Sequence, residues 1–520
     1  MKIVTAEQMQ RIDRLAAGQG LTPAMLMEIA GKLVAEELKK AAGSVTGKRI
    51  LVAVGPGNNG GDGLVAARYL YDWGADIIVY LCKERAFDDK NLIRLAERGV
   101  PIIHADRDIT CVELDKALKQ VEIIVDAVFG TGRTRVIDGS FKTVLIRIGA
   151  AKEDRPDILL CAVDMPSGMN ADTGEVDPSC PRADITVTLG YPKPGFYAFP
   201  GSDYAGKVII ADIGIPSGLA DDVTVNLITS DMVRDILPRR PSNANKGTFG
   251  KVLIIAGSMN YIGAAYLACM GAARCGAGLV TLAAAKSLVP VLAAKLTETT
   301  YLPLPEKDGA IAPGAISVIK DILEGYDAVL IGCGLGQRKQ TAAFVTSFTD
   351  ICSRRSEQII IYDADALNIL SQVPRWWQKL SGDVILTPHP GEMSRLCGVA
   401  VEEIQRKRME TAGQYAKQWN KVVVLKGAYS VVAAPDGQQA INALAYAGLA
   451  SAGTGDVLAG IIAGLAAQGL SPFNAALSGV YIHGEAGLKA GQSTGPAGLM
   501  AGDIIPLIPG VIKGINDSTV

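Results

Sequence analysis

The stretch RILVAVGPGNNGGDG, residues 49–63, joins an apolar run to a glycine-rich loop and decides the fold of the first half of the chain. The run 49–55 has the length and the apolar character of a strand that is buried on both faces of a sheet. The loop after it is expected to enter a helix near Asp62. Strand, glycine loop and helix in this order are typical of parallel α/β sheets, where loop N–H groups and the helix dipole bind an anion.

The loop does not match two common phosphate-binding patterns. It lacks GxxxxGK[ST], and its glycines are not spaced as GxGxxG, so an ordinary P-loop and the usual dinucleotide fingerprint are both excluded. The glycines alone would also suit plain turn geometry. A function for this loop therefore depends on the polar residues at neighbouring strand ends.

Strand-length apolar runs alternate with helical stretches in both halves, which predicts an α/β fold with parallel sheets covered by helices on both faces. Two helices are expected over residues 5–40, the second opening after Pro23. A region rich in Pro, Asn and Gly, 215–248, separates the halves and predicts two domains, 1–225 and 226–520. The first is expected to be a Rossmann-like three-layer sandwich. The remaining predicted strands are 76–81, 121–130, 157–164, 251–258, 277–284, 327–334, 358–365, 383–390 and 421–427.

The composition excludes several classes of protein. A formal charge of -2 and only 5% aromatic residues argue against a nucleic-acid partner. The nine cysteines are scattered and never spaced as CxxC, which predicts buried thiols in a reducing cytoplasm. No signal-peptide core is present at the N-terminus. The uncharged stretch 457–482 contains Gln468, Pro472 and Asn474, so we expect two buried helices joined by a turn and no membrane association.

Two aspartates in the first half are expected at the carboxyl ends of strands. Asp126 precedes the glycine turn in AVFGTGRTR, and Asp164 stands in VDMPSG with Ser167. Together with the asparagines of the loop they supply hard oxygen ligands and acid or base groups, which favours a monovalent or hard cation beside a polar substrate. Each aspartate alone would equally cap a turn. Convergence on one sheet edge favours a ligand site.

The motifs TAEQMQRID, LMEIAG, GPGNNGGDG, DAVFGTG and VDMPSG, in this order and spacing, closely resemble the N-terminal domain of NAD(P)HX epimerases. That family interconverts the R and S forms of hydrated NADH or NADPH. One departure is Ile29, where the family pattern has asparagine. The resemblance implies a potassium ion held by Asn59, Asp126 and Ser167, and contacts to the hydrated dinucleotide from Asp164 and from Asn58, Asn59, Gly60, Gly61, Asp62, Gly130, Thr131, Gly132, Arg133, Thr134, Arg135 and Val136.

The substrate chemistry agrees with these residue types. Its hydroxyl sits on a carbon bonded to nitrogen, so epimerisation proceeds by loss and readdition of that group or by ring opening. Either route moves protons and needs a positioned carboxylate. Asp126 is the first candidate for catalysis and Asp164 the second, and the sequence does not separate their roles.

The strongest signal of the second half is SAGTGDVLAGIIAGL, residues 451–465. Its glycines permit a sharp turn, and a helix starting near Asp456 would present N–H groups to an anion. Asp456 would then lie beside a transferred phosphoryl group and take a proton from a hydroxyl. This looks like the anion-hole motif of ribokinase-like kinases. The alternative is a glycine-rich helix start that Asp456 caps.

With TPHPGEM, VVVLKGAYS, GCGLGQ and NKGTFGKVLIIAGS, this motif makes the second half resemble ADP- or ATP-dependent NAD(P)HX dehydratases, which have a ribokinase-like α/β fold. The resemblance implies that Ala264, Gly336, His389 and Asp456 contact the hydrated cofactor. It also implies that the adenine nucleotide binds to Lys426, Gly427, Ala428, Tyr429, Ser430 and Gly455.

Two of these assignments carry alternatives. For His389 a binding role is favoured over proton transfer, and a turn cap is the alternative. Lys426 would neutralise phosphate or only anchor a strand end. The chain contains no NxxE, so Mg²⁺ is expected to arrive with the nucleotide.

These resemblances predict a bifunctional cofactor-repair enzyme. The first domain would equilibrate the epimers, and the second would dehydrate the S form at the expense of ADP, because phosphorylation turns hydroxide into a better leaving group. The alternative is a vitamin-precursor kinase with a non-catalytic binding or scaffold domain in front, against which Asp126, Asp164 and both asparagines argue. ADP over ATP and a homo-oligomer are expected from the family alone. A preference for NADHX or NADPHX is not predicted.

Overall fold

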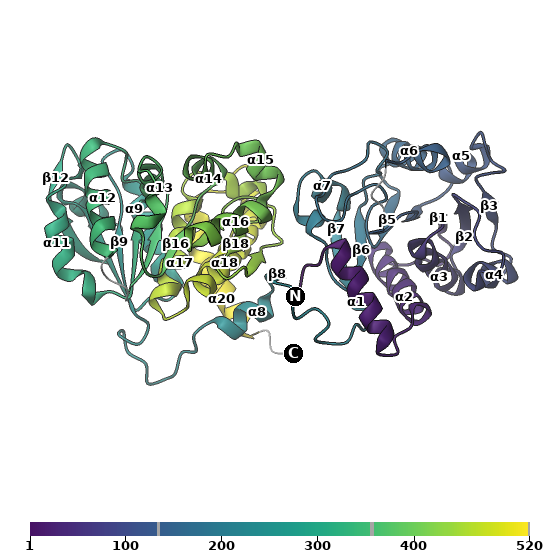
Figure 1. The fold of residues 1–520 in the computed structure, drawn as a ribbon, viewed down its shortest axis with the longest axis horizontal. Coiled ribbons are helices and arrows are strands. Elements are labelled where there is room, and N and C mark those ends of the chain that lie inside the picture. Colours follow the sequence, from purple (N-terminus) through teal and green to yellow (C-terminus); the bar gives the residue numbers. More distant parts are fainter. Residues whose placement is uncertain (133–135, 354–357, 518–520) are drawn as a thin grey trace. The chain divides into compact units, whose positions relative to one another are not determined.

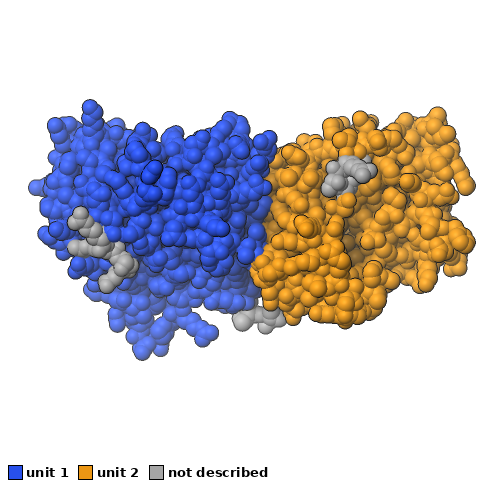
Figure 2. Space-filling model, in the orientation of Figure 1, with its two compact units in different colours: residues 1, 224–520 blue, residues 2–223 orange. Residues whose placement is uncertain are grey.

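The computed structural model describes residues 1–132, 136–353 and 358–517. The chain forms two compact units (Figure 2). We call Lys2–Val223 the N-terminal unit, and Thr224–Val520 together with Met1 the C-terminal unit. Figure 1 shows helices on both faces of the main sheet in each.

The sheet of the N-terminal unit has the strand order β3-β2-β1-β4-β5-β6-β7, and neighbouring strands pair in parallel. Its strands are β1 (Arg49–Val54), β2 (Asp76–Leu81), β3 (Ile102–His104), β4 (Ile123–Ala127), β5 (Leu159–Val163), β6 (Ile185–Leu189) and β7 (Lys207–Ala211). Its helices are α1 (Ala6–Gly18), α2 (Pro23–Ala42), α3 (Asn58–Asp72), α4 (Lys90–Glu97), α5 (Val112–Leu118), α6 (Gly139–Asp154), α7 (Gly201–Ala205) and the 3₁₀ turn η1 (Pro194–Tyr197).

Alternate residues of β1 supply the two hydrophobic cores of this unit. Ile50, Val52 and Val54 pack with α2 and α3 on one face, and Leu51 and Ala53 pack with α5 and α6 on the other. Because side chains alternate along a strand, an unbroken apolar run is what a sheet with two covered faces requires. The predicted three-layer α/β sandwich is confirmed.

The start of α3 differs from the prediction. The helix begins at Asn58, not near Asp62, and Gly57 is its N-terminal cap residue. A Cβ at Gly60 would lie 2.1 Å from the carbonyl oxygen of Gly55, and one at Gly63 would lie 2.3 Å from the Cβ of Ala127. These glycines therefore let the first helical turn pass close to the strand ends, and the loop is shorter than the sequence pattern suggests.

The C-terminal unit has the sheet order β11-β10-β9-β14-β15-β16-β17-β18-β19-β8, which is parallel except where β18 pairs with β17 and β19. Its strands are β8 (Val225–Leu227), β9 (Lys251–Ile255), β10 (Leu279–Ala285), β11 (Thr300–Leu304), β12 (Glu306–Lys307), β13 (Ala310–Ile311), β14 (Ala328–Ile331), β15 (Ile359–Tyr362), β16 (Val384–Leu386), β17 (Val422–Leu425), β18 (Val431–Ala433) and β19 (Gln439–Ile441).

The helices of the C-terminal unit cover this sheet, as Figure 1 shows. They are α8 (Ser230–Ile236), α9 (Ile262–Arg274), α10 (Val289–Ala293), α11 (Ala315–Ile322), α12 (Lys339–Cys352), α13 (Asp365–Leu370), α14 (Pro390–Cys397), α15 (Val401–Arg406), α16 (Arg408–Trp419), α17 (Thr454–Ala467), α18 (Pro472–Thr494), α19 (Ala501–Ile504), α20 (Ile508–Asp517), and the 3₁₀ turns η2 (Lys286–Leu288), η3 (Leu323–Gly325), η4 (Trp376–Lys379), η5 (Ala447–Ala450) and η6 (Ile505–Leu507).

Helices α17 and α18 account for the uncharged stretch near the C-terminus. They are joined by a short turn and belong to the core, as predicted. A Cβ at Gly460 would lie 2.1 Å from the carbonyl oxygen of Ala268, so α17 and α9 pack backbone to backbone. Among the described helices none is long and apolar enough to cross a membrane. All nine cysteines are described; each is a free thiol, eight are buried as expected, and Cys397 is half-buried.

Each sheet reverses its strand order once, between β1 and β4 in the N-terminal unit and between β9 and β14 in the C-terminal unit. Ligands of open α/β sheets bind beyond the carboxyl ends of the strands at such a reversal. The motifs singled out in the sequence follow these strands. Ligand sites are therefore expected at these two edges.

Candidate functional site

A cavity of about 1110 Å³ lies at the carboxyl ends of β1 and β4. One wall is apolar and comes from α1 and α2, including Met9, Leu26 and Met27. The polar wall contains many of the residues predicted to bind substrate, namely Asn58, Asn59, Asp62, Gly130, Thr131, Gly132, Val136 and Asp164. Gly60 and Gly61 do not line it, and Arg133, Thr134 and Arg135 lie outside the described residues.

Arg85 holds the glycine loop from outside. Its Nη1 donates to the carbonyl oxygens of Gly55 (2.5 Å) and Gly57 (3.0 Å), and its Nε donates to Asp89 (2.7 Å). Arg85 therefore binds the loop through its backbone carbonyl oxygens, and Asp89 pairs with its charge. No motif in the sequence pointed to Arg85, which follows β2.

Asp164 is the best-oriented carboxylate of the cavity. Its Oδ1 accepts hydrogen bonds from Lys193 Nζ (2.5 Å), from the N–H of Leu189 (3.2 Å) and from Thr188 Oγ1 (3.3 Å). No described residue donates to its Oδ2, which lies 3.4 Å from the point a Cβ of Gly130 would occupy; Asn59 Oδ1 lies 3.2 Å from the same point. Glycine at 130 therefore keeps open the space between Asn59 and Asp164.

Lys193 is a functional candidate that the sequence reading missed. Its side chain is 1% exposed, and Nζ also donates to Thr188 Oγ1 (2.9 Å) and to the carbonyl oxygen of Leu189 (3.4 Å). A lysine is buried this far only when it is paired. The segment YPKPG offered no spacing signal, because its partner is 29 residues away in the sequence.

Three more aspartates line this cavity, Asp13, Asp62 and Asp138. Burial raises the pKa of Asp62 well above its ordinary value, and the nearby carboxylates of Asp164 and Asp13 raise it further. Burial also raises the pKa of Asp13, on α1, while Lys193 lowers it. The cavity therefore holds carboxylates with different tendencies to ionise, an arrangement typical of acid and base chemistry.

Asp126 does not line the cavity; it lies fully buried within β4. Its carboxylate accepts from Ser167 Oγ (2.6 Å), from Ser167 N–H (2.8 Å) and from Val128 N–H (3.2 Å). Burial raises the pKa of Asp126, and these hydrogen bonds oppose that effect. No cationic side chain is among its hydrogen-bond partners in the described chain.

The predicted potassium ligands are compatible with a hard cation. Asp126, Ser167 and Asn59 offer carboxylate, hydroxyl and amide oxygens, the donors that such ions prefer. The amide Nδ2 of Asn59 is buried and has no hydrogen-bond partner among the described residues. A monovalent cation would supply the positive charge that the buried carboxylate of Asp126 lacks.

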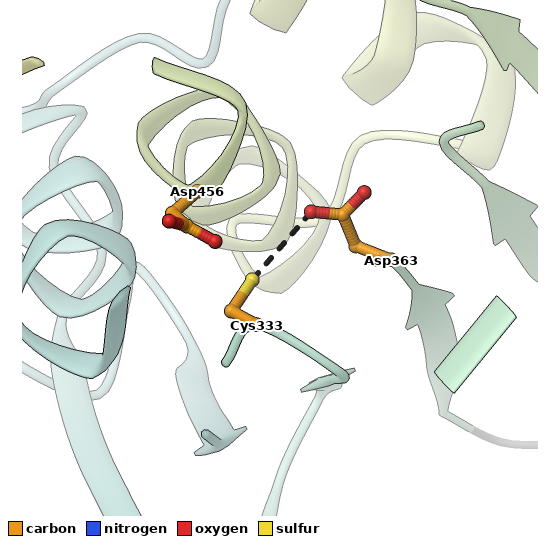
Figure 3. Close-up of side chains that lie close together, drawn as sticks. All are labelled: Cys333, Asp363 and Asp456. Carbon is orange, nitrogen blue, oxygen red and sulfur yellow. Dashed lines mark hydrogen bonds between the residues drawn. The ribbon is translucent and has the colours of Figure 1, made fainter. Parts of the chain in front are cut away.

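In the C-terminal unit, the first turn of α17 brings Asp456 to the carboxyl edge of the sheet. Gly453 precedes it with φ +88°, a left-handed conformation that suits glycine. Figure 3 shows Asp456 beside Cys333, which follows β14, and Asp363, which follows β15. The three ligand atoms lie within 4.8 Å of one another. Burial, followed by the carboxylate of Asp363, raises the pKa of Asp456 to about 6.

Lys426 lies beside both Asp363 and the predicted anion-binding turn. Its Nζ donates to Asp363 Oδ1 (2.6 Å) and lies 3.8 Å from Glu392 Oε2. A Cβ at Gly455 would lie 3.5 Å from the same nitrogen. Burial alone would lower the pKa of Lys426, but the two carboxylates outweigh it and raise the pKa. Burial raises the pKa of Glu392 to about 7.

His389 caps α14. Its Nδ1 accepts from the N–H groups of Gly391 (3.0 Å) and Glu392 (3.4 Å), while Glu392 Oε2 accepts from the N–H of His389 (2.8 Å). Burial lowers the pKa of His389, so the neutral imidazole required of this acceptor is favoured. His389 therefore caps the helix, as the alternative predicted, and its contact with substrate stays a prediction.

A second cavity, of about 260 Å³, lies at the β9–β14 reversal. Its lining includes Gly336, whose N–H donates to Asp365 Oδ2 (2.8 Å). Ala264 is outside this lining and packs behind it, 2.7 Å from the point a Cβ of Gly334 would occupy. The predicted nucleotide residues after β17 form a tight turn in which Ser430 Oγ donates to the carbonyl oxygen of Gly427 (2.8 Å).

Several residues around Asp456 were missed in the sequence. Cys333 lies within GCGLGQ and Glu392 within TPHPGEM, but the predictions from these two motifs named only Gly336 and His389. Asp363 and Asp365 end the run QIIIYDAD. Their position after a strand was the available signal, since carboxyl ends of parallel strands meet at one edge.

Comparisons with known proteins cover both units. Residues 252–509 match the family described as NAD(P)H-hydrate dehydratase, and residues 23–195 match the family described as YjeF-related protein N-terminus. The chain is similar to the bifunctional NAD(P)H-hydrate repair enzyme Nnr of Moorella thermoacetica, with 40% identity over 526 residues, 99% of this chain and 98% of the relative. The protein of the same description from Thermofilum pendens is 36% identical, over 99% and 97%.

Among solved structures, the ADP/ATP-dependent NAD(P)H-hydrate dehydratase from Bacillus subtilis, co-crystallized with ATP/Mg2+, is 36% identical. It covers 56% of this chain and 99% of its own, with a TM-score of 0.49.

Proposed function

Since the chain belongs to the family of bifunctional NAD(P)H-hydrate repair enzymes, we propose that each of its two units carries one of the two repair reactions. The N-terminal unit interconverts the R and S epimers of hydrated NADH or NADPH. The C-terminal unit dehydrates the S epimer with ADP. The observation that carries this proposal is a carboxylate at the carboxyl edge of each sheet, Asp164 in one and Asp456 in the other.

For epimerisation, the cavity favours Asp164 over Asp126 as the acting carboxylate. Asp164 lines the cavity and presents its unbonded Oδ2 there, whereas Asp126 is buried behind it. Asp62, whose raised pKa favours the protonated form, gives a proton to the leaving hydroxyl, and the ring nitrogen stabilises the resulting cation. Water adds to the opposite face and loses a proton to Asp164 Oδ2, which completes the exchange of epimers.

A potassium ion is held by Asn59, Asp126 and Ser167. It supplies positive charge beside the buried carboxylate and fixes the strand ends that frame the cavity. Asn59→Ala is expected to raise the potassium concentration needed for half-maximal epimer exchange, because one oxygen ligand is lost. Titrating exchange with potassium against a sodium background measures this, and an unchanged midpoint would contradict the assignment.

For dehydration, Asp456 takes the proton of the substrate hydroxyl, and the hydroxyl oxygen attacks the terminal phosphorus of ADP, whose phosphoanhydride bond breaks to release AMP. The N–H groups of the turn before α17 stabilise the transferred phosphoryl group. The carbon–oxygen bond then breaks, and phosphate leaves with the bonding electrons. Loss of a proton from the neighbouring carbon restores the nicotinamide ring. Residues 426–430 and Gly455 bind the nucleotide, and Mg²⁺ bound to it neutralises phosphate charge.

The decisive experiment supplies purified hydrated NADH with ADP, ATP or neither, and follows the return of the reduced-nicotinamide absorbance. Recovery with ADP supports the proposal, and no recovery with either nucleotide excludes dehydration. Adding thiazole or pyrimidine alcohols with ATP tests the rival vitamin-precursor kinase. Phosphorylated alcohol without cofactor recovery would favour that rival.

Three finer assignments complete the proposal. ADP is preferred over ATP, the protein is a homo-oligomer, and it works in the cytoplasm on small molecules. Each follows from the family expectation. Rate comparison with the two nucleotides, light scattering and cell fractionation test them in turn.

A further inference from the structure

Cys333, Asp363 and Asp456 place a sulfur and two carboxylates around one point at the edge of the C-terminal sheet (Figure 3). Cys333 and Asp363 are buried, and Asp456 is partly buried. The proposed dehydration uses only Asp456 of the three. A thiol beside two carboxylates is a mixed set of soft and hard ligands, which differs from the oxygen-only set that Mg²⁺ prefers.

The spacing of these atoms suits a tetrahedral ion. Cys333 Sγ lies 3.6 Å from Asp363 Oδ2. In a tetrahedral Zn²⁺ site, with Zn–S of about 2.3 Å and Zn–O of about 2.0 Å, sulfur and oxygen ligands stand roughly 3.5 Å apart. The pair therefore already has the separation of one edge of such a site, and Asp456 supplies a third ligand from α17.

The carboxylate of Asp363 is held in the required orientation. Its Oδ1 accepts from Lys426 Nζ (2.6 Å) and from Thr387 Oγ1 (2.7 Å), which leaves Oδ2 directed at Cys333. Metal ligands are commonly oriented by such outer hydrogen bonds. The charge of Lys426 opposes a cation, but Asp363 and Glu392 both lie beside that ammonium.

We propose that Cys333, Asp363 and Asp456 form an inhibitory site for a thiophilic divalent cation of the Zn²⁺ class, with water in the fourth position. Binding forms a metal–sulfur bond as the Cys333 thiol releases its proton to solvent, and two metal–oxygen bonds with the carboxylates. The ion binds the carboxylate of Asp456, which then cannot act as the base in dehydration. Only this inhibitory consequence rests on the proposed function; metal binding itself does not.

The first test measures binding in the full chain with Co²⁺ as a spectroscopic substitute for Zn²⁺. A thiolate-to-cobalt charge-transfer band is expected, with one ion per chain, and Zn²⁺ should displace it. Cys333→Ala and Cys333→Ser should remove the band and weaken Zn²⁺ binding at least ~10-fold. The matched control is Cys397→Ser, which removes the half-buried thiol of α14 and should leave the band intact. Persistence of the band in both Cys333 variants would overturn the proposal.

The second test measures inhibition. With hydrated NADH and saturating Mg²⁺ and ADP, Zn²⁺ should abolish dehydration, and a chelator should restore it. Epimer exchange in the same chain is the internal control and should continue. Each Cys333 variant, compared with its own zinc-free rate, should need at least ~10-fold more Zn²⁺. Equal sensitivity would refute the inhibitory site. If the chain dehydrates nothing, the proposed function fails, while the cobalt spectrum still decides whether the cluster binds metal.

Discussion

A buried lysine in the N-terminal unit orients the carboxylate that faces the larger cavity. Lys193 bonds to Asp164 Oδ1 and leaves Oδ2 directed at Gly130 and Asn59. Asp164 itself has φ +62°, an uncommon backbone conformation for a residue other than glycine. Such strain is found where the surrounding structure holds a functional group in place. Lys193 is therefore a positioning residue for epimer exchange.

Replacing Lys193 by Met should lower the rate of epimer exchange by roughly 100-fold, because Asp164 loses both its orientation and its cationic partner. The loss should fall on kcat and leave KM nearly unchanged, because Lys193 orients the acting carboxylate. Dehydration should stay unchanged. Lys119→Met, at an exposed lysine outside the cavity lining, is the control. A loss carried by KM alone, with kcat unchanged, would contradict the positioning role of Lys193.

The pKa of Asp456, about 6, predicts how the rate of dehydration and the stability of the unit depend on pH. A base acts when ionised, so dehydration should lose rate as pH falls through about 6, roughly tenfold per pH unit below it. The pKa of Asp456 is higher in the folded chain, about 6, than its ordinary value of 3.8. Ionisation of Asp456 therefore lowers the stability of the folded unit as pH rises between these two values. Asp456→Asn should therefore abolish dehydration yet stabilise the unit at pH 7 by about 1 to 3 kcal/mol, measured by urea unfolding.

A second buried carboxylate provides the control for this assignment. The pKa of Glu392 is raised to about 7, so Glu392 also titrates near neutrality. Measuring the pH profile of Glu392→Gln separates the two groups. If the limb near pH 6 vanished in that variant, the titration would belong to Glu392 and not to Asp456.

At the scale of elements, the two anion-facing turns owe their shape to close packing. Helix α3 begins four residues earlier than the glycine pattern indicated, because Gly60 and Gly63 fit against Gly55 and Ala127. Helix α17 likewise packs on α9 through Gly460. Contacts of this kind join segments that are distant in the sequence, so the local pattern reveals the glycines but not their neighbours.

Two alanine substitutions test the packing of α3. Gly60→Ala places a methyl group 2.1 Å from the carbonyl oxygen of Gly55 and should destabilise the start of the helix by about 1 to 3 kcal/mol. Gly57→Ala is the matched partner, since nothing lies within 4 Å of its Cβ position and its φ of -91° suits alanine. Hydrogen exchange of α3 should accelerate only in the first variant. Equal protection in both would show that the close contact costs nothing.

Most of the strands that the sequence did not predict are short or half-exposed. The long apolar runs were predicted as strands and are strands, because burial on both faces demands an unbroken apolar pattern. The three-residue strands β3, β8, β18 and β19 carry too few residues for any period to appear, and they were missed. The five-residue strands β6, β7 and β11 and the two-residue strands β12 and β13 were missed as well. β7 and β11 are partly exposed, whereas β6 is buried but alternates threonine with apolar residues.

At the scale of the whole molecule, the two proposed reactions occupy separate units. Asp164→Asn should abolish epimer exchange and leave dehydration of the pure S epimer intact. Asp456→Asn should do the reverse. Exchange is followed by chromatographic separation of the epimers, and dehydration by nicotinamide absorbance. Loss of both activities in either variant would contradict the division of labour.

The sequence by itself determined the α/β class, the long strands, the two glycine turns and the family, because these rest on local periodicity and on motifs read along the chain. The tertiary structure decided which side chains meet. It paired Lys193 with Asp164, buried Asp126 away from the cavity, and brought Cys333 and Asp363 to Asp456. Parallel strands joined by helical crossovers bring together residues far apart in sequence, so contacts at the sheet edge leave no spacing signal.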